Sequence, residues 1–198
     1  LVAVSGTAFA DSSTVNSSQN GSYNEVGVVQ AYANHSTTTI NQTGNVNKSA
    51  VNQGATHSTL NITQQGDYNT ASGQQYGSHN TANTNQTGNT VQEAATVQGG
   101  SHNNAGITQT YNFHGKAAVV QADGYGSHNT GSIVQSNNNT SAANVRQNGD
   151  HNNGSIDQGN NFVANASLAQ GGNHNAASIN QQVSNYATAG VAQAGNHN

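Results

Sequence analysis

The chain of 198 residues contains no cysteine, proline, methionine or tryptophan, and few charges: three Lys or Arg and seven Asp or Glu. Without cysteine, the chain cannot form disulfide bonds, thiolate metal sites or a thiol catalytic centre. The net charge of -4 leaves no basic surface for nucleic acid. No apolar run approaches the ~20 residues of a membrane-spanning helix. Neither nucleic acid nor a membrane span is therefore expected.

A register of glutamines runs through the chain in place of long apolar segments. Successive members lie at most 12 residues apart, except for one step of 14. The register consists of Gln19, Gln30, Gln42, Gln53, Gln64, Gln75, Gln86, Gln98, Gln109, Gln121, Gln135, Gln147, Gln158, Gln170, Gln181 and Gln193. Each of these glutamines closes one segment of the chain, and two successive segments form a repeat of about 22 to 23 residues, which is too small to bury a core alone. The sequence therefore predicts stacked repeats rather than disorder.

Within each segment, inward and outward residues alternate with the period of a strand. The residue two positions before each glutamine is usually apolar: Val28, Ile40, Val51, Ile62, Ile107, Val119, Ile133, Val145, Ile156, Leu168, Ile179 and Val191. Residues spaced by two share one face of a strand, so these side chains and the glutamines are expected to point inward. The predicted fold is all-β, a β-solenoid (β-helix) of about eight two-strand turns with cross-β stacking. Residues 11–198 are expected to form this single domain.

The inward amides are expected to form ladders along the stack. With strands ~4.8 Å apart, each side-chain amide can donate to one neighbour and accept from the other. Asparagines that open strands belong to the same set: Asn24, Asn47, Asn69, Asn80, Asn103, Asn129, Asn152 and Asn175. The terminal strands carry no proline or inward charge that would block pairing with another chain. We therefore interpret the glutamines and asparagines as assembly residues, with a second copy of the chain as partner.

The repeat itself resembles that of a known family. Ser58, Gln64, Gly66, Asn69 and Gln75 match the pattern of the curlin repeat, and the resemblance to the major curli amyloid subunit covers nearly all of the chain. It implies a secreted structural subunit that assembles end to end into extracellular fibres of the biofilm matrix at the bacterial cell surface, supporting adhesion and aggregation of cells. It also implies a nucleator subunit and an outer-membrane secretion pore as partners, and no cofactor. A minor, nucleating curli subunit is the nearest alternative.

Two features depart from the family pattern. From Asn80 onward, asparagine opens the strands that serine opens in earlier repeats, such as the one at Ser58. The family also has a Gly-rich leader, and little lies here between the first strand and residues 1–10. These ten residues begin with the apolar run Leu1 to Val4 and have small residues at Ala8 and Ala10, as at a cleavage site, so we interpret them as the C-terminal part of a secretory signal peptide. An ordinary apolar terminus is the alternative.

Seven histidines each precede a register glutamine by seven residues: His35, His57, His79, His102, His128, His151 and His174. His197 begins the next such position. In a solenoid they form one edge column, which would suit transition-metal binding or a pH response. The alternative is that histidine, like asparagine, tolerates turn geometry. Because no carboxylate accompanies the column, no firm metal site is predicted. His114 is placed on the opposite edge.

The outward positions supply two further predictions. Glu25 with Lys48, and Glu93 with Lys116, are expected to be cross-strand neighbours of opposite charge. Many outward residues of the other sheet are Thr, Asn or Ser, which leaves an ice-binding or glycan-binding solenoid as a less favoured reading because the array is interrupted. An enzyme is not expected, since no carboxylate pair and no Ser, His and Asp set is indicated.

Overall fold

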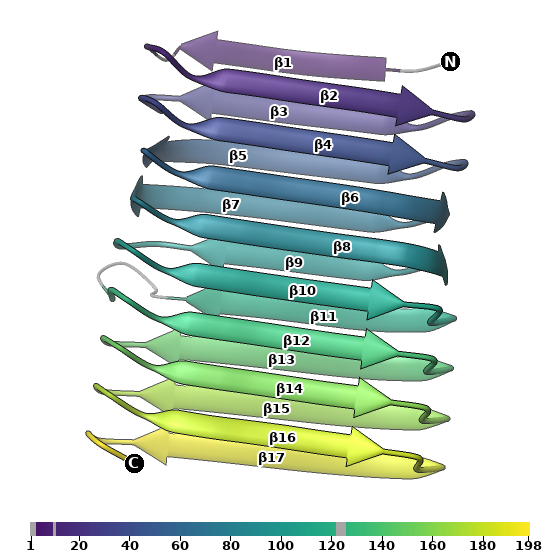
Figure 1. Ribbon diagram of the computed structural model, residues 1–198, viewed down its shortest axis with the longest axis vertical. Coiled ribbons are helices and arrows are strands. Elements are labelled where there is room, and N and C mark those ends of the chain that lie inside the picture. Colours follow the sequence, from purple (N-terminus) through teal and green to yellow (C-terminus); the bar gives the residue numbers. More distant parts are fainter. Residues whose placement is uncertain (1–2, 10, 122–125) are drawn as a thin grey trace.

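The computed structural model describes the backbone of residues 3–9, 11–121 and 126–198, and the side chains of these residues apart from 3–9 and Asn89. This part of the chain contains seventeen strands and no helix. The strands alternate between two parallel sheets that lie face to face (Figure 1). The predicted β-solenoid of about eight turns is confirmed.

Even-numbered strands form the eight-stranded sheet, in the order β16-β14-β12-β10-β8-β6-β4-β2. Their bounds are β2 (Thr14–Asn20), β4 (Thr37–Thr43), β6 (Thr59–Asp67), β8 (Thr81–Thr90), β10 (Asn104–Thr110), β12 (Thr130–Ser136), β14 (Asn153–Gly159) and β16 (Ala176–Gln182). Odd-numbered strands follow one another in the nine-stranded sheet. Their bounds are β1 (Ala3–Phe9), β3 (Glu25–Ala31), β5 (Lys48–Thr56), β7 (Thr70–Ser78), β9 (Glu93–Gln98), β11 (His114–Gln121), β13 (Thr140–Asn148), β15 (Val163–Gly171) and β17 (Tyr186–Ala194).

One coil of the solenoid is an even-numbered strand together with the odd-numbered strand that follows it, so that coil 1 is β2 with β3 and coil 8 is β16 with β17. The connections inside a coil lie along one edge, called here the opposite edge. The connections between coils lie along the other, called here the histidine edge. The two series of connections are visible at the two sides of the stack in Figure 1.

Identical residues face one another along the stack because the strands pair in parallel and in register. Gln42 of β4 lies opposite Gln64 of β6, and Gln121 of β11 lies opposite Gln147 of β13. The second pairing is kept although a longer connection, part of it (residues 122–125) outside the described residues, separates these strands in sequence. A register shift occurs between Gln65 and Gly66, where β6 meets β8.

The apolar core is a thin layer between the two sheets. Inward isoleucines such as Ile40, Ile107 and Ile133 are at most 1% exposed, and small residues, mostly alanine, occupy many of the other inward positions. Inward residues of the end strands are only partly covered, because no further coil lies on them; the inward side chain of Val15 is 40% exposed. A second copy of the chain could cover these ends.

Residues 3–9, which we interpreted as part of a signal peptide, form β1 and pair in parallel with β3. Ala8 stands opposite Gln30 in this pairing. The strand therefore extends the nine-stranded sheet by one position beyond the first coil. Its removal from the mature protein stays a prediction.

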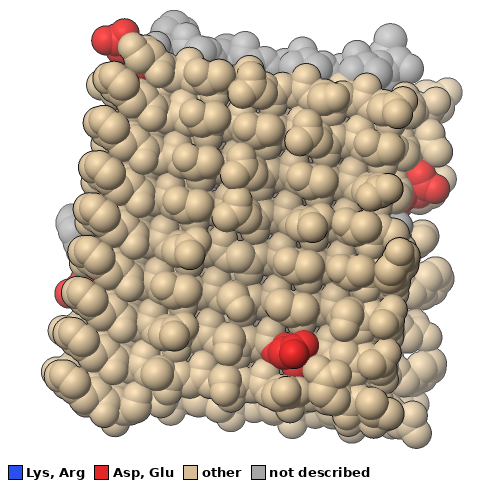
Figure 2. Space-filling view, in the orientation of Figure 1, with Lys and Arg blue, Asp and Glu red and all other residues tan. Residues whose placement is uncertain are grey.

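The outer face of the eight-stranded sheet is almost free of charge (Figure 2). Asp157, exposed on β14, is the acidic residue of this face. The threonines predicted on it are present, but the column that contains Thr39 continues with Asn61, Asn83 and then Gly106. The face therefore lacks the regular threonine array that an ice-binding surface requires. Among the described residues, no helix long and apolar enough to cross a membrane is found.

Candidate functional site

The glutamine register forms two continuous hydrogen-bonded ladders, one along each sheet. Each Gln Nε2 donates to the Gln Oε1 of the next coil at 2.7 to 2.9 Å, from Gln19 and Gln30 at one end to Gln181 and Gln193 at the other. These side chains are buried along most of the stack. The amides therefore satisfy one another in an interior where unpaired amides would be costly.

The direction of each ladder is fixed by the second amide hydrogen. It is donated to a main-chain carbonyl of the facing sheet, as in Gln98 to Thr81 at 2.9 Å and Gln147 to Thr130 at 2.8 Å. An amide turned by 180° would place its oxygen against that carbonyl oxygen. All the ladder donors therefore point toward the C-terminal coil, and all the acceptors face the N-terminal coil.

The two ends of the stack consequently present different groups. At the N-terminal end, the Oε1 atoms of Gln19 and Gln30 have no hydrogen-bond partner among the described residues. At the C-terminal end, Gln181 and Gln193 each donate one hydrogen to a carbonyl, of Asn165 and Ala176 respectively, and retain a second N–H. Acceptors at one end thus complement donors at the other.

A second kind of ladder is built from the buried asparagines, which lie where the sequence predicted them. Except at Asn69, the Oδ1 accepts the main-chain N–H of the counterpart in the next coil, as between Asn24 and Asn47 at 3.0 Å. The Nδ2 donates to a glycine carbonyl of the next coil, as from Asn47 to Gly66 at 2.7 Å. The same pattern recurs on the histidine edge at Asn80, Asn103, Asn129, Asn152 and Asn175. Their contribution to assembly, like that of the glutamines, stays a prediction.

Glycine makes these compact turns possible. In the five-residue step from Gln42 to Asn47, Gly44 has φ +112° and Val46 has φ +57°. A Cβ at position 44 would lie 2.1 Å from the carbonyl oxygen of Gly66 in the next coil. Only glycine therefore fits the close stacking of these turns. We call a turn of this kind, with glycine two residues after the glutamine and asparagine at its end, the compact arch.

The asparagine ladder of the opposite edge stops after coil 3. Asn69 is fully buried, yet neither its Oδ1 nor its Nδ2 has a hydrogen-bond partner among the described residues. The next turn, from Gln86 to Gln92, is one residue longer, and the register shift between β6 and β8 falls there. This longer turn, called here the wide arch, moves the glycine carbonyl and the main-chain N–H away from Asn69.

The wide arches contain a further ladder that the sequence analysis missed. Asn112, Asn138 and Asn161 are 2 to 3% exposed, and each lies three residues after a register glutamine. Their Nδ2 atoms donate to the carbonyls of register glutamines in the next coil, at 2.9, 2.9 and 3.0 Å. The constant spacing from the glutamine was the sequence signal that could have identified them.

The predicted histidine column is present as a stack of parallel rings. Neighbouring ring centroids lie 4.7 to 5.1 Å apart, with interplanar angles of 1 to 6°, from His35 to His197. Every member is exposed and has a positive φ between 51 and 60°. His114 lies apart from the column, as predicted, and its ring contacts that of Phe113 edge to face. No group of three or more potential metal ligands occurs among the described residues.

One carboxylate adjoins the column. Asp150 Oδ1 accepts hydrogen bonds from the hydroxyl and the main-chain N–H of Ser127, at 2.9 and 2.8 Å. The hydroxyl bond, the main-chain bond and the nearby charges of His151 and His128 hold the pKa of the Asp150 carboxyl below its ordinary value, against a smaller opposing effect of burial. Negative charge is therefore kept beside these two imidazoles.

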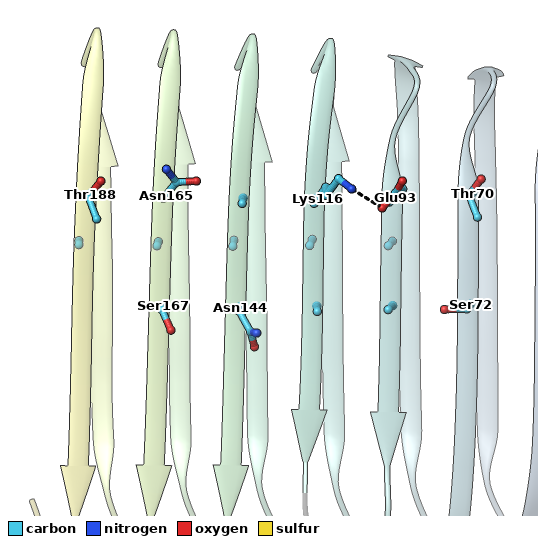
Figure 3. A pocket seen from close by; sticks show the side chains of 16 residues that line it. Thr70, Ser72, Glu93, Lys116, Asn144, Asn165, Ser167 and Thr188 are labelled. Atoms are coloured by element: carbon cyan, nitrogen blue, oxygen red, sulfur yellow. Dashed lines mark ion pairs between the residues drawn. The ribbon is translucent and has the colours of Figure 1, made fainter.

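The outer face of the nine-stranded sheet carries a shallow groove with an alanine floor (Figure 3). Labelled polar side chains along it include Thr70, Asn144 and Ser167. The predicted pair of Lys116 and Glu93 lies in this groove at 2.9 Å, and that of Lys48 and Glu25 is found at 3.8 Å. Neutral hydroxyl and amide groups with one ion pair provide no acid–base or nucleophilic set.

Comparison with known proteins agrees with this architecture. Residues 56–88 match the family model described as the curlin associated repeat. No match was found among curated proteins or among solved structures. The matched segment begins just before Ser58 and contains Gln64, Gly66, Asn69, Gln75 and Gln86, and the same register continues through the stack on both sides of it. Residues 56–88 of the chain are therefore similar to the curlin associated repeat.

Proposed function

We propose that the chain is a secreted structural subunit that polymerises end to end into extracellular, curli-type amyloid fibres. The observation that carries this proposal is the complementarity of the two ends. Donors on Gln181 and Gln193 match unpaired acceptors on Gln19 and Gln30, and all four belong to ladders with the same spacing. A second copy placed on the C-terminal coil would continue both ladders without changing their direction.

The main chain supports the same arrangement. Parallel in-register strands extend without interruption from β2 to β16 in one sheet. The outer strands β16 and β17 each have an unpaired edge, without a proline or an inward charge to block it. Pairing with another chain would therefore repeat the contacts already made between coils, as in cross-β fibres.

Strand β1 bears on how such a fibre would begin. It covers the edge of β3, and Ala8, which stands opposite Gln30, has no carboxamide to continue the ladder. Removal of residues 1–10, as expected for a signal peptide, would free that edge. The same proposal includes a nucleator subunit, a secretion pore in the outer membrane and a place in the bacterial biofilm matrix. These three parts are supported by the similarity to the curlin repeat alone.

The test starts from denatured chain that begins at Asp11, diluted into neutral buffer without any partner. We expect unbranched fibres in electron micrographs and a meridional reflection at ~4.7 to 4.8 Å. The chain of residues 1–198, diluted in parallel, should assemble more slowly because β1 covers one growth edge. A stable soluble monomer from the Asp11 chain, even with added fibre seeds, would overturn the proposal.

Glutamate variants test the direction of the ladder. Gln181→Glu with Gln193→Glu removes the terminal donors, so elongation at neutral pH should nearly stop. It should recover when the carboxyls are protonated, near pH 4, because a carboxylic acid can donate. The pair Gln19→Glu with Gln30→Glu keeps acceptors for an incoming copy but removes the hydrogen bonds donated to Gln42 and Gln53, so circular dichroism must first show that its fold is intact. With the fold intact, this pair should slow growth less. Equal inhibition by both pairs would contradict the head-to-tail arrangement.

A further inference from the structure

On the histidine edge, the same turn position is histidine in every coil connection from His35 to His197, and turn geometry does not explain this uniformity. All eight column positions, from His35 to His197, have the left-handed φ expected of a tight turn. The compact arches of the opposite edge require the same conformation at the same place, immediately before the buried asparagine. There the chain uses Tyr23, Val46 and Tyr68. The backbone therefore accepts tyrosine and even valine, and the uniform histidine requires another reason.

The column keeps histidine although the turn around it changes. Ser36 and Ser58 follow the first two members, whereas asparagines follow the later ones. The turns differ in length as well, since His35 closes a longer connection than His57 does. A residue retained through these changes is selected by what its side chain does at the surface.

The imidazoles are available to a ligand. Every column ring is exposed, and within the described residues none donates or accepts a hydrogen bond or joins an ion pair. Their contacts are with one another, as parallel rings 4.7 to 5.1 Å apart. The coils thus present a line of nitrogen ligands at constant spacing. Neutral imidazole prefers borderline divalent ions such as Zn²⁺, Ni²⁺ and Cu²⁺.

We propose that the histidine edge is a linear transition-metal site, in which two imidazoles of adjacent coils share one Zn²⁺, Ni²⁺ or Cu²⁺ ion. A metal–nitrogen bond is about 2.0 to 2.1 Å, so the two nitrogens must approach to about 4.2 Å or less. Since neighbouring rings are at most 5.1 Å apart, tilting two exposed side chains toward each other closes the difference. Water fills the remaining positions, so the ion is exchangeable.

Two details make the proposal specific. Eight histidines taken in adjacent pairs give four ions per chain. The pair His128 and His151 should bind most tightly, because Asp150 directly precedes His151 and its carboxylate accepts hydrogen bonds from Ser127, which directly precedes His128. Ser12 occupies the column position before His35 and has the same positive φ, 56°. Stacked subunits would therefore have one break per chain, and the count should be the same before and after assembly.

The decisive experiment compares two variants with the same number of histidines. The alternating variant replaces His57, His102, His151 and His197 with tyrosine, which leaves four imidazoles two coils apart. The block variant replaces His128, His151, His174 and His197 with tyrosine, which leaves four adjacent imidazoles, none in the pair beside Asp150. Tyrosine is the natural residue at this turn position in Tyr23 and Tyr68, so both variants should keep the fold, as circular dichroism will verify.

Equilibrium dialysis against Zn²⁺ should give four ions for the unaltered chain and two for the block variant. The alternating variant should bind roughly 100-fold more weakly, because no ion can then reach two imidazoles. Electron paramagnetic resonance of bound Cu²⁺ should show two nitrogen ligands in the block variant and one in the alternating variant. Equal affinity and equal nitrogen number in the two variants would overturn the proposal.

The opposite edge allows the converse test. Tyr23→His, Val46→His and Tyr68→His introduce three adjacent imidazoles at the equivalent positions, and should add one bound ion per chain. His114→Asn removes the histidine outside the column and should leave the number of bound ions unchanged. A loss of bound metal in His114→Asn, or no gain on the opposite edge, would contradict a site that depends on stacked pairs.

Discussion

The opposite edge is closed in two ways, by compact arches in coils 1 to 3 and by wide arches in coils 4 to 8. The histidine edge changes in the other direction, from turns that end in Ser36 and Ser58 to compact arches that end in asparagine. Both glutamine ladders pass through the change without a break. The comparison teaches that the ladders fix the stacking of coils, while each edge accepts either form of turn.

On the opposite edge, the change from compact to wide arches leaves unpaired amide groups where coil 3 meets coil 4. Asn69 is the last asparagine of its ladder and is buried without a partner in the described part of the chain. Gln92 takes the corresponding position in the next coil, and its Oε1 is likewise unpaired there. Along the histidine edge the transition is smoother, because Ser58 Oγ still accepts the main-chain N–H of Asn80 at 3.0 Å. A hydroxyl can therefore precede an asparagine in the ladder, whereas the change from compact to wide arch on the opposite edge leaves Asn69 unpaired among the described residues.

The largest effect is expected from the glycines of the compact arches. Gly44→Ala on the opposite edge and Gly149→Ala on the histidine edge each place a Cβ about 2 Å from a carbonyl oxygen of the next coil, at a positive φ. Each should lower the free energy of unfolding by about 3 kcal/mol or more, measured by denaturant unfolding before assembly. Gly106→Ala is the matched control, since nothing lies within 4 Å of its Cβ position. A tolerated Gly149→Ala would mean that the arch did not move to the histidine edge.

The next comparison is between two asparagines one coil apart. Asn47→Ala leaves the Gly66 carbonyl and the Asn69 N–H unpaired and should cost ~1 to 3 kcal/mol. Asn69→Ala removes a side chain that has no partner and should cost clearly less, although both substitutions delete the same atoms. Denaturant midpoints of the two variants decide the matter. Equal losses would show that Asn69 is satisfied in solution, for example by water.

A smaller effect should appear with pH at the compact arch of Asp150. Its pKa is lowered by the hydrogen bonds from Ser127, so its contribution to stability is present above the pKa of the unfolded chain and is lost as the pH falls through the folded value. Unfolding of the soluble chain should therefore become easier below about pH 4. Asp150→Asn should reduce this dependence, with a change below ~1 kcal/mol at pH 7. Asparagine suits the position, since Asn173 occupies it in the next coil. An unchanged pH profile would exclude the effect.

The smallest effect on stability is expected from the two surface ion pairs, one between coils 1 and 2 and the other between coils 4 and 5. Glu25→Gln and Glu93→Gln should each change the free energy of unfolding by less than ~1 kcal/mol, because the paired side chains are 58 to 69% exposed. The loss should be larger for Glu93, whose pair is closer, and both losses should vanish in high salt. Thermal unfolding at two salt concentrations measures this. A salt-independent loss would point to packing rather than charge.

The sequence predicted what is local and repeated. The alternation around residues such as Ile62 and Gln64 indicates strand faces directly, and the repeats place the same residue types above one another. The histidine column and both ion pairs followed from counting back from the glutamines. Each of these features depends only on the register, which the amino-acid sequence contains.

Other features depended on contacts between the sheets or between turns of unequal length. The direction of the glutamine ladders follows from a second hydrogen bond to the facing sheet, as from Gln98 to Thr81. The unpaired state of Asn69 results from a one-residue difference between neighbouring turns. The pairing of β1 with β3 was not expected, because Ala3–Phe9 lacks a glutamine of the register.

The uniform sense of the glutamine ladders gives the molecule an electrical direction. A carboxamide has about the same dipole as a peptide unit, ~3.5 D, and the register amides point their hydrogens toward the same end of the stack. Their dipoles therefore add along the axis instead of cancelling, with the positive end at Gln193. Fibres of such subunits would inherit the sum, so they should align in an applied electric field and all face the same way relative to it.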